Sequence, residues 1–540
     1  MRLILKGLAV VTLSLVGATV AVAATPVTMG VVPSFAEETA SAGVDSTFKG
    51  DWKYIVGGGV ATFDCNDDGF PDMFLAGGEN AAKFYLNQSK RGGALKFKEA
   101  TSGLEETQVV GAYPIDINSD GIMDLVVLKS GKSEVMQGKG DCKFEHASET
   151  WNFTSDDNKW WTAFSATWEH GNTWPTIAMG SYISITHSID IDPWGSCSGS
   201  VLERPRADQT GFDTAIALKP SWCPLSMLFT DWNRSGTQSL RVSNDREYYR
   251  GGSEQLFHVD PGQAPKPYTV DEGWKPLKIW GMGIASADIN GDGYPDYFLT
   301  SMADNKLQTL TSPPVDGVVK ADFKDVAFPL GAIAQRPYTG GDMHPSTAWH
   351  AQFEDVNNDC IPDLFIAKGN VSDMLDFAMQ DPDNLLLGQP DGKFVEVGDK
   401  AGVASMNVGR GAGLPDFNLD GLPDLVVVNR NHPAQVWRNT TANAGNWLDL
   451  KLEQEGSNRN AIGAWIEVKS GEVTMTREVT VGGGHASGQQ TWVHFGLNSM
   501  TDADVTITWP DGTKSAPMHV NANAFYVLKP GKDAAAWSPA

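Results

Sequence analysis

The stretch ASADINGDGYPDYFLT, residues 285–300, contains an oxygen-rich loop between two segments that read as strands. The loop has alternating oxygen donors, a glycine and a closing aspartate: Asp288, Asn290, Asp292, Gly293 and Asp296. Calcium takes about six to eight oxygen ligands, and alternate residues of a tight loop direct their oxygens inward. Small residues precede the loop and a Tyr-Phe-Leu-Thr run follows it, so we expect a turn between strands, not between helices.

The same pattern, D-x-[DN]-x-[DN]-G-x-x-D, recurs along the chain. Its five copies span residues 64–72, 116–124, 288–296, 355–363 and 416–424, and Cys360 takes the glycine position in the fourth of these. An apolar tetrad, typical of a strand, follows each last aspartate: MFLA, LVVL, YFLT, LFIA and LVVV. Five residues before the first aspartate stands a glycine in four copies and a histidine in the other: Gly59, Gly111, Gly283, Gly411 and His350.

Two weaker copies complete a regular series. DWNRSGTQS, residues 231–239, keeps most of the oxygen donors, whereas WEHGNTWPT, residues 168–176, keeps only Asn172. The seven first positions are 64, 116, 168, 231, 288, 355 and 416, at steps of 52, 52, 63, 57, 67 and 61 residues. Seven units of this length, each with several short strands, predict a seven-bladed β-propeller. We expect it to span residues 47–440, after an N-terminal linker at 24–46.

The five copies predict about five structural Ca²⁺ sites. The donor positions are the first, third, fifth and ninth of each copy: Asp64, Asn66, Asp68, Asp72, Asp116, Asn118, Asp120, Asp124, Asp288, Asn290, Asp292, Asp296, Asp355, Asn357, Asp359, Asp363, Asp416, Asn418, Asp420 and Asp424. Calcium is favoured over magnesium because cages made only of protein oxygens suit the larger ion. The fourth turn, with Asp231, Asn233 and Ser235, should bind weakly or not at all, and the third should not bind. Each ion would stabilise its blade, since three carboxylates crowd one turn without it.

The charge of the chain fits a protein that binds cations. The formal charge is −25, from 41 basic and 66 acidic residues. Such a balance argues against nucleic acid and against anionic membranes as partners, because both would be repelled. A soluble acidic surface explains part of the same composition.

The first residues read as an export signal. Arg2 and Lys6 precede an apolar run from Leu8 to Val22, and Ala21-Val22-Ala23 fits a cleavage site for a signal peptide at residues 1–23. The alternative is a membrane anchor, but the run is short, broken by polar residues and followed by proline. We therefore expect a periplasmic or secreted protein without a membrane span. Its five cysteines are an odd number, and Cys197 and Cys223, which flank one segment, form the preferred disulfide.

The repeats resemble a known family. The small-residue stretches VGGGVATFD, GMGIASADIN and GRGAGLPDFN, each leading into an acidic turn, are similar to the FG-GAP, or VCBS-type, repeats of integrin alpha-subunit propellers. This resemblance implies a seven-bladed propeller with Ca²⁺ in the strand-connecting turns of some blades.

The C-terminal part resembles the ASPIC/UnbV domain that follows such propellers in bacterial proteins and in the cartilage acidic protein family. The matching features are N-x-x-A-I-G-A, R-E-V-x-x-G-G-G, H-F-G-L and W-P-D-G, with His485 at a position that is usually tyrosine. We expect a small β domain over residues 445–530. Its strands should lie near residues 464–469, 475–481, 492–495 and 505–509.

No nucleophile elbow, H-E-x-x-H, Walker loop or dinucleotide fingerprint is present. The most catalytic-looking stretch is RPYTGGDMHPSTAWH, with Arg336, Tyr338, Asp342, His344 and His350. These side chains could serve as acid and base or as metal ligands. The alternative is a polar loop between blades, and His485 and His494 have a similar structural alternative.

Tryptophans gather around the third turn: Trp160, Trp161, Trp168, Trp174 and Trp194. They either stack on a sugar or a partner protein, or fill the space between sheets. We expect a binding or scaffold module, similar to an adhesion protein, for a protein or glycan partner. The alternative is a carbohydrate-active lyase or hydrolase that uses the Asp342–His350 loop. The two hypotheses differ in one expectation: an enzyme requires those side chains to converge at the central channel of the propeller.

Overall fold

The structure is a computed structural model that describes residues 30–186, 197–245, 251–311, 318–333 and 342–539. The expected signal peptide at residues 1–23 lies outside the described residues, as do Trp194, Arg336 and Tyr338. Within the described ranges, no helix is long and apolar enough to cross a membrane.

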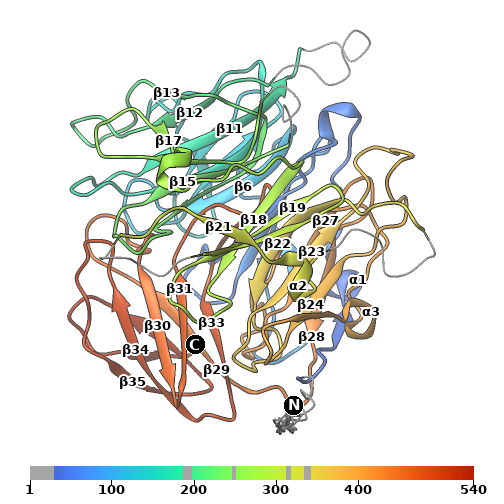
Figure 1. The fold of residues 1–540 in the computed structure, drawn as a ribbon, viewed down its shortest axis with the longest axis vertical. Coiled ribbons are helices and arrows are strands. Elements are labelled where there is room, and N and C mark those ends of the chain that lie inside the picture. The colour runs from blue at the N-terminus through green and yellow to red at the C-terminus, as the bar shows by residue number, and fades with distance from the viewer. Residues whose placement is uncertain (1–29, 187–196, 246–250, 312–317, 334–341, 540) are drawn as a thin grey trace, which may run out of the picture.

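Seven antiparallel sheets, here called blades 1 to 7, follow one another along the chain (Figure 1). Blade 1 comprises β2 (Val60–Phe63), β3 (Asp72–Leu75), β4 (Lys83–Asn87) and β5 (Phe97–Glu99); blade 2, β6 (Val109–Ile115), β7 (Asp124–Lys129), β8 (Glu134–Gly138) and β9 (Phe144–His146); blade 3, β10 (Lys159–Thr167), β11 (Thr176–Ser184), β12 (Ser200–Glu203) and β13 (Ile216–Leu218); blade 4, β14 (Pro224–Thr230), β15 (Ser239–Asn244), β16 (Gln255–His258) and β17 (Lys266–Pro267).

The remaining blades have the same order. Blade 5 comprises β18 (Gly281–Ala287), β19 (Asp296–Ser301), β20 (Lys306–Leu310) and β21 (Phe323–Asp325); blade 6, β22 (Ala348–Glu354), β23 (Asp363–Lys368), β24 (Asn384–Gly388) and β25 (Phe394–Glu396); blade 7, β26 (Gly409–Gly413), β27 (Leu425–Asn429), β28 (Gln435–Asn439) and β1 (Phe35–Glu37). Short helices lie in the connections: α1 (Thr39–Ala42), η1 (Trp52–Tyr54), η3 (Val270–Glu272), α2 (Ala327–Leu330) and α3 (Gly398–Ala401).

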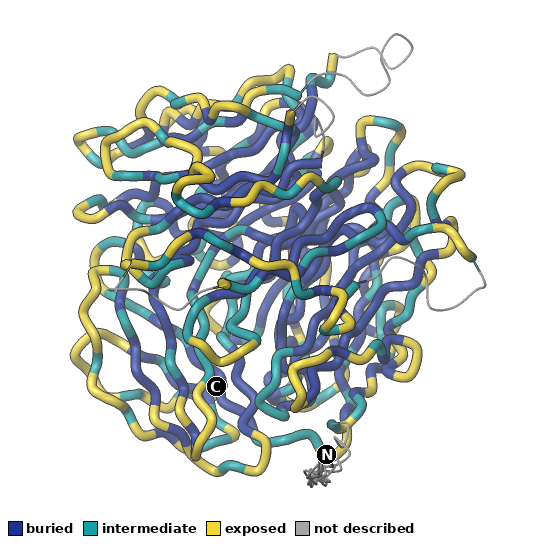
Figure 2. The backbone as a smooth tube through the Cα atoms, viewed as in Figure 1, coloured by how far each residue is buried: buried dark blue, intermediate teal, exposed yellow. Residues whose placement is uncertain are grey.

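The blades close into a ring through their first strands. β2, β6, β10, β14, β18, β22 and β26 contact one another in this order, and β26 contacts β2 again. The ring confirms the seven-bladed propeller. Most of the blade backbone is buried, and exposed backbone is concentrated in the connections (Figure 2).

Blade 7 combines the two ends of the propeller sequence. Phe35 pairs with Asn439 and Glu37 with Trp437, so β1 is the outer strand next to β28. This strand falls inside residues 24–46, the segment expected as a linker. The sequence pattern did not reveal it because the strand has three residues and no turn of its own. The pairing ties the N-terminal strand into the last blade and so closes the ring.

Residues 446–537 form two further sheets, here called the C-terminal sandwich (Figure 1). One sheet has the order β33 (Val493–Asn498), β29 (Asn446–Leu452), β36 (Ala524–Leu528) and β37 (Ala535–Trp537); the other has β31 (Val473–Glu478), β30 (Trp465–Ser470), β34 (Asp502–Thr508) and β35 (Met518–Asn521). Alternating apolar residues of β30 and β34, such as Ile466 and Val505, are fully buried. Strands β30, β31, β33 and β34 lie close to the four predicted ranges.

One segment of the C-terminal part leaves the sandwich and enters the propeller. Residues 481–490, here called the arm, run past the first strands of five blades. β32 (Gly488–Gln490) pairs in parallel with β2, and bridges join Ser487 to Ala112, Val481 to Ala166, Gly482 to Leu228 and Gly484 to Ile284. The C-terminal part is therefore joined to the propeller by its own chain, which runs along the first strands of five blades.

Candidate functional site

Each acidic turn joins the first strand of a blade to the second, as the sequence pattern predicts. In blade 5, Asp288 Oδ2 accepts a hydrogen bond from the Gly293 N–H at 2.9 Å. Asp292 Oδ1 accepts from the Tyr294 N–H at 2.9 Å, and Asp296 Oδ2 accepts from the Ile289 N–H at 3.0 Å. The backbone thus folds around its own carboxylates.

The other turns repeat these hydrogen bonds. The first aspartate accepts from the backbone N–H of the sixth residue at 2.7–2.9 Å in every copy: Asp64, Asp116, Asp231, Asp355 and Asp416. In four blades the last aspartate also accepts from the third strand: Asp72 from Asn87, Asp124 from Gly138, Asp363 from Gly388 and Asp424 from Asn439. The five expected sites therefore share one local structure, and in four of them it is also tied to the third strand of its blade.

The last aspartates of the five turns are buried. Burial, followed by repulsion from the other carboxylates of the turn, raises the pKa of Asp72 and of Asp296 to about 8. The pKa values of Asp124, Asp363 and Asp424 are raised well above the usual range, again chiefly by burial. Among the described residues, none of the fifteen turn aspartates forms an ion pair with lysine or arginine within 4.0 Å. Buried carboxylates of this kind fit a hard cation with oxygen ligands.

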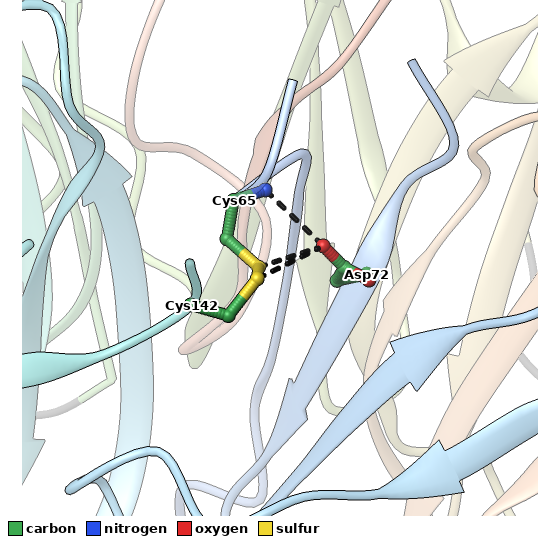
Figure 3. Close-up of side chains that lie close together, drawn as sticks. All are labelled: Cys65, Asp72 and Cys142. Carbon is green, nitrogen blue, oxygen red and sulfur yellow. Dashed lines mark hydrogen bonds between the residues drawn. A yellow bond between two sulfur atoms is a disulfide. The ribbon is translucent and has the colours of Figure 1, made fainter. Parts of the chain in front are cut away.

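The carboxylates of a turn are not gathered as tightly as metal ligands. In four turns the asparagine amide N–H₂ donates to the fifth-position aspartate at 2.8–3.0 Å, in the order Asn66, Asn118, Asn357 and Asn418. In the part of the chain that the structure describes, three ligand atoms of His, Cys, Asp or Glu lie within 4.8 Å of one another only at Cys65, Asp72 and Cys142 (Figure 3).

The group in Figure 3 is a disulfide beside a carboxylate, not a thiolate metal site. Cys65 is bonded to Cys142 across 77 positions of sequence. Asp72 Oδ2 lies 2.8 Å from the Cys65 sulfur, but a disulfide sulfur carries no proton, so the donor to this oxygen is the Cys65 backbone N–H at 3.1 Å. The preferred pair Cys197–Cys223 is confirmed, and the fifth cysteine, Cys360, is free.

The fourth and sixth residues of the six aspartate-containing turns have a left-handed backbone. At the sixth position φ is +79° to +88° for the glycines and +72° for Cys360, which therefore takes a conformation that a side chain disfavours. At the fourth position φ lies between +53° and +71° in six turns, which carry Asp67, Ser119, Arg234, Gly291, Asn358 and Leu419.

The sequence pattern allows any residue at the fourth position of the turn, yet in several turns this residue contacts the C-terminal sandwich. Asn358 Oδ1 lies 2.7 Å from His494 Nε2, and Ser119 Oγ accepts from the Asn458 N–H at 3.3 Å. The Arg234 guanidinium stacks on the Trp465 ring at 3.8 Å. Leu419 is fully buried in a cluster with Trp447 and Phe525. The sequence signal for this position is its tolerance of a left-handed backbone, which Asp, Asn, Ser and Gly share.

The two weak turns differ from the other five. In the fourth turn, Asp231 uses both oxygens on the backbone N–H groups of Ser235 and Gly236, and Asn233 and Ser235 add no carboxylate. Glu478 of the sandwich accepts from the Asp231 N–H at 2.8 Å. In the third turn, Glu169 pairs with Arg204 and bonds to Thr176.

The tryptophans around the third turn belong mostly to the core. Trp160, Trp161 and Trp174 are buried, as expected if they fill the space between sheets. Trp168 is half-buried and lines a cavity of about 610 Å³ between the third turn, the fourth turn and the W-P-D-G turn of the sandwich.

The described residues of the catalytic-looking loop do not converge. Asp342 and His344 pair with each other at 2.8 Å at the surface, where the His344 side chain is 56% exposed. His350 is buried in the channel, and its Nδ1 accepts from the His485 backbone N–H at 3.1 Å. Burial lowers the pKa of His350 to about 4 and, together with nearby Arg410, lowers that of His485 to about 3. Both imidazoles are therefore neutral parts of the packing at neutral pH.

His494 has a structural role as well. Its Nδ1 lies 3.1 Å from Asp449 and its other ring nitrogen contacts Asn358. Burial alone would lower its pKa, but the charges of Asp449, Glu354 and Asp355 raise it.

Two family models match parts of the chain. Residues 64–127 match the FG-GAP-like repeat, and residues 454–535 match ASPIC and UnbV. The resemblance indicated by the turn motif and by the C-terminal glycine segment is thus confirmed for these two segments. No curated protein matches the chain significantly.

Solved structures resemble the chain distantly. Sqt1 of Saccharomyces cerevisiae has 12% identity and a TM-score of 0.39 over 74% of this chain and 100% of that one. An Agrocybe aegerita lectin specific for non-reducing terminal N-acetylglucosamine has 15% identity and a TM-score of 0.38, covering 68% and 88%. The lectin BP39L of Burkholderia pseudomallei has 10% identity and a TM-score of 0.39, covering 72% and 97%. No functional conclusion follows at these scores.

Proposed function

We propose that the protein is an exported, calcium-stabilised propeller that acts as a binding or scaffold module for a protein or glycan. The observation that carries the proposal is the fivefold repetition of one carboxylate turn whose buried aspartates have no lysine or arginine partner among the described residues. Five Ca²⁺ ions would supply a charge of +10 against the formal charge of −25. The ions would stabilise the fold and would take no part in catalysis.

The proposed ligands are the first, third, fifth and ninth residues of the five turns. In blade 5 these are Asp288, Asn290, Asp292 and Asp296. Binding requires the asparagine to turn its amide oxygen, instead of its N–H₂ group, toward the ion in the four turns where it now donates to the neighbouring aspartate. Ion binding then adds to the free energy of unfolding, because the unfolded chain lacks the site.

Binding is favoured over catalysis by the positions of the candidate acid–base residues. Asp342 and His344 lie at the surface and His350 lies in the channel, so these three do not share a pocket. The channel contains the arm of the same chain. The face that carries the turns is occupied by the C-terminal sandwich, which leaves the opposite face and the outer rim for a partner.

Export is supported by two disulfides, Cys65–Cys142 and Cys197–Cys223, because such bonds persist in oxidising compartments. The apolar N-terminus remains the sequence argument for a periplasmic or secreted protein.

Calcium titration of the purified protein tests the first part of the proposal. We expect about five bound ions per chain after gel filtration in calcium, and a melting temperature that falls by many degrees in EGTA. A protein without bound calcium and with the same melting temperature in EGTA would contradict the proposal.

Glycan arrays and affinity capture from periplasmic extract in calcium test the second part. Saturable binding of one glycan class or one protein, without turnover of the bound glycan, is the expected result. Release of cleaved sugar would identify a lyase or hydrolase instead.

A further inference from the structure

The face of the propeller that carries the turns is the docking surface of the C-terminal sandwich. Each aspartate-containing turn contributes a contact. The pairs are Gly69 with Trp492, Ser119 with Asn458, Asp231 with Glu478, Asp288 with Thr476, Asn358 with His494, and Leu419 with Trp447. The sandwich therefore rests on all six of these turns.

In two blades the sandwich reaches the carboxylates themselves. Thr476 Oγ1 donates a hydrogen bond to Asp288 Oδ2 at 3.0 Å. Gly496 passes so close to Asp355 that a Cβ on this glycine would lie 1.9 Å from Asp355 Oδ2. Residues of the sandwich thus contribute to the surroundings of proposed ligands that belong to the propeller.

The arm extends the same docking into the channel. The Gly483 and Gly484 N–H groups donate to the carbonyls of Met227 and Ile284 at 2.7 and 2.6 Å, which are first-strand residues of blades 4 and 5. A Cβ on Gly59 would lie 1.8 Å from the Ala486 carbonyl oxygen, and one on Gly111 would lie 2.3 Å from it. The glycines that precede the turns in sequence therefore make room for the arm.

Docking and ion binding act on the same backbone. Without a cation, crowding of three carboxylates in one turn disfavours their charged forms and favours an open turn, which would displace the fourth-position residue that contacts the sandwich. With the cation, the turn and its contact residue are held in one geometry. Two events that stabilise the same conformation are thermodynamically linked, and the linkage is reciprocal.

We propose that calcium binding by the turns and seating of the C-terminal sandwich, with its arm in the channel, form one linked equilibrium. In this scheme Thr476 is a positioning residue for the blade 5 site, although it is not a ligand and lies 188 positions from Asp288 in sequence. The inference rests on the proposed calcium function. It adds that sandwich residues determine calcium affinity and that calcium determines whether the channel is filled.

The first experiment measures calcium affinity by isothermal titration calorimetry of the full-length protein carrying Thr476→Val. Valine keeps the shape and removes the hydroxyl donor to Asp288. We expect one of about five sites to weaken by about fivefold, the usual effect of one hydrogen bond. Thr474→Val is the matched control, because Thr474 is exposed two residues away on the same face of β31 and should leave every site unchanged.

The second experiment measures hydrogen–deuterium exchange of residues 481–490 in wild type, in calcium and in EGTA. We expect the Gly483 and Gly484 amides to exchange faster in EGTA. Their hydrogen-bond acceptors lie on first strands of the propeller, and these bonds break when the sandwich and its arm undock. Wild type that binds no calcium would overturn the proposed function. Wild type that binds calcium, with unchanged affinity in Thr476→Val and a protected arm in EGTA, would overturn only the linkage.

Discussion

His485 donates its backbone N–H to Nδ1 of His350 at 3.1 Å, although 135 positions separate the two residues in sequence. His485 Nε2 in turn accepts from the Gly57 N–H at 3.1 Å. Both rings thus act as neutral acceptors that join the arm to blade 6 and to the connection that leads into blade 1. His350 takes the place that glycine has in the four other copies, and here the arm itself supplies the glycine, since a Cβ on Gly484 would meet the His350 ring at 2.4 Å.

The buried histidines predict a loss of stability in acid. The pKa of His350 is lowered to about 4 in the folded protein, against about 6.5 when unfolded. Its contribution is therefore fully present above pH 6.5 and is lost as the pH falls toward 4. His350→Asn keeps an acceptor but cannot titrate, so wild type should lose up to about 1.4 kcal/mol per pH unit more than the variant in this window. Denaturant unfolding at saturating calcium measures the difference, and parallel pH profiles would refute it.

Asp292→Ala should remove one calcium ion and destabilise the protein. Asp292 occupies the fifth position of the blade 5 turn, where it offers a carboxylate and holds the Tyr294 N–H. Loss of a site that is saturated one hundredfold above its Kd costs about 2.7 kcal/mol. Ser235→Ala, at the same position of the fourth turn, is the control and should change neither the calcium count nor the melting temperature by a comparable amount. An unchanged calcium count in Asp292→Ala would exclude the site.

Leu419→Asn should weaken the docking of the C-terminal sandwich. Leu419 has φ of +53° and is fully buried against Trp447 and Phe525. Asparagine tolerates this backbone, as Asn358 does in blade 6, so the substitution mainly removes apolar packing. Loss of a buried leucine costs about 2–5 kcal/mol. Urea unfolding and proteolysis within residues 440–445 should report it, whereas Asp67→Asn at the exposed equivalent position should behave as wild type.

Cys360→Gly should stabilise the protein. Cys360 holds φ of +72° at the position where four of the five expected sites have glycine, and a side chain in this conformation costs about 1 kcal/mol. Glycine removes that cost, while Cys360→Ser keeps both the side chain and the strain and is the control. The melting temperature of Cys360→Gly should be higher than that of wild type, and the melting temperature of Cys360→Ser should equal that of wild type. A glycine variant no more stable than wild type would show that the backbone is not strained here.

Blade architecture was predictable because its signals are local. The spacing from Asp64 to Asp416, the apolar tetrads and the glycine of each turn repeat within a few residues, and local hydrogen bonds produce the same turn each time. The last aspartate could be predicted as a turn residue, but its bond to the third strand could not, because that strand is about 15 residues further on.

The role of the fourth turn position was not predictable. Ser119, Asn358 and Leu419 share no side-chain chemistry, only a left-handed backbone, and each contacts a different residue of the C-terminal sandwich. The separation of the candidate acid–base residues was not predictable either. Asp342 and His350 are close in sequence, but His350 is buried within β22, the first strand of blade 6, whereas Asp342 pairs with His344 at the surface.

The sequence by itself determined seven related turns between strands, five of them acidic throughout, and a C-terminal β unit, because turn chemistry and strand alternation act over short distances. The tertiary structure alone decided that β1 closes blade 7, that the arm occupies the channel and that the turns carry the C-terminal sandwich. These features depend on pairings between residues that lie hundreds of positions apart. Such pairings form only where the packed ring brings a backbone edge, a glycine and a matching donor together.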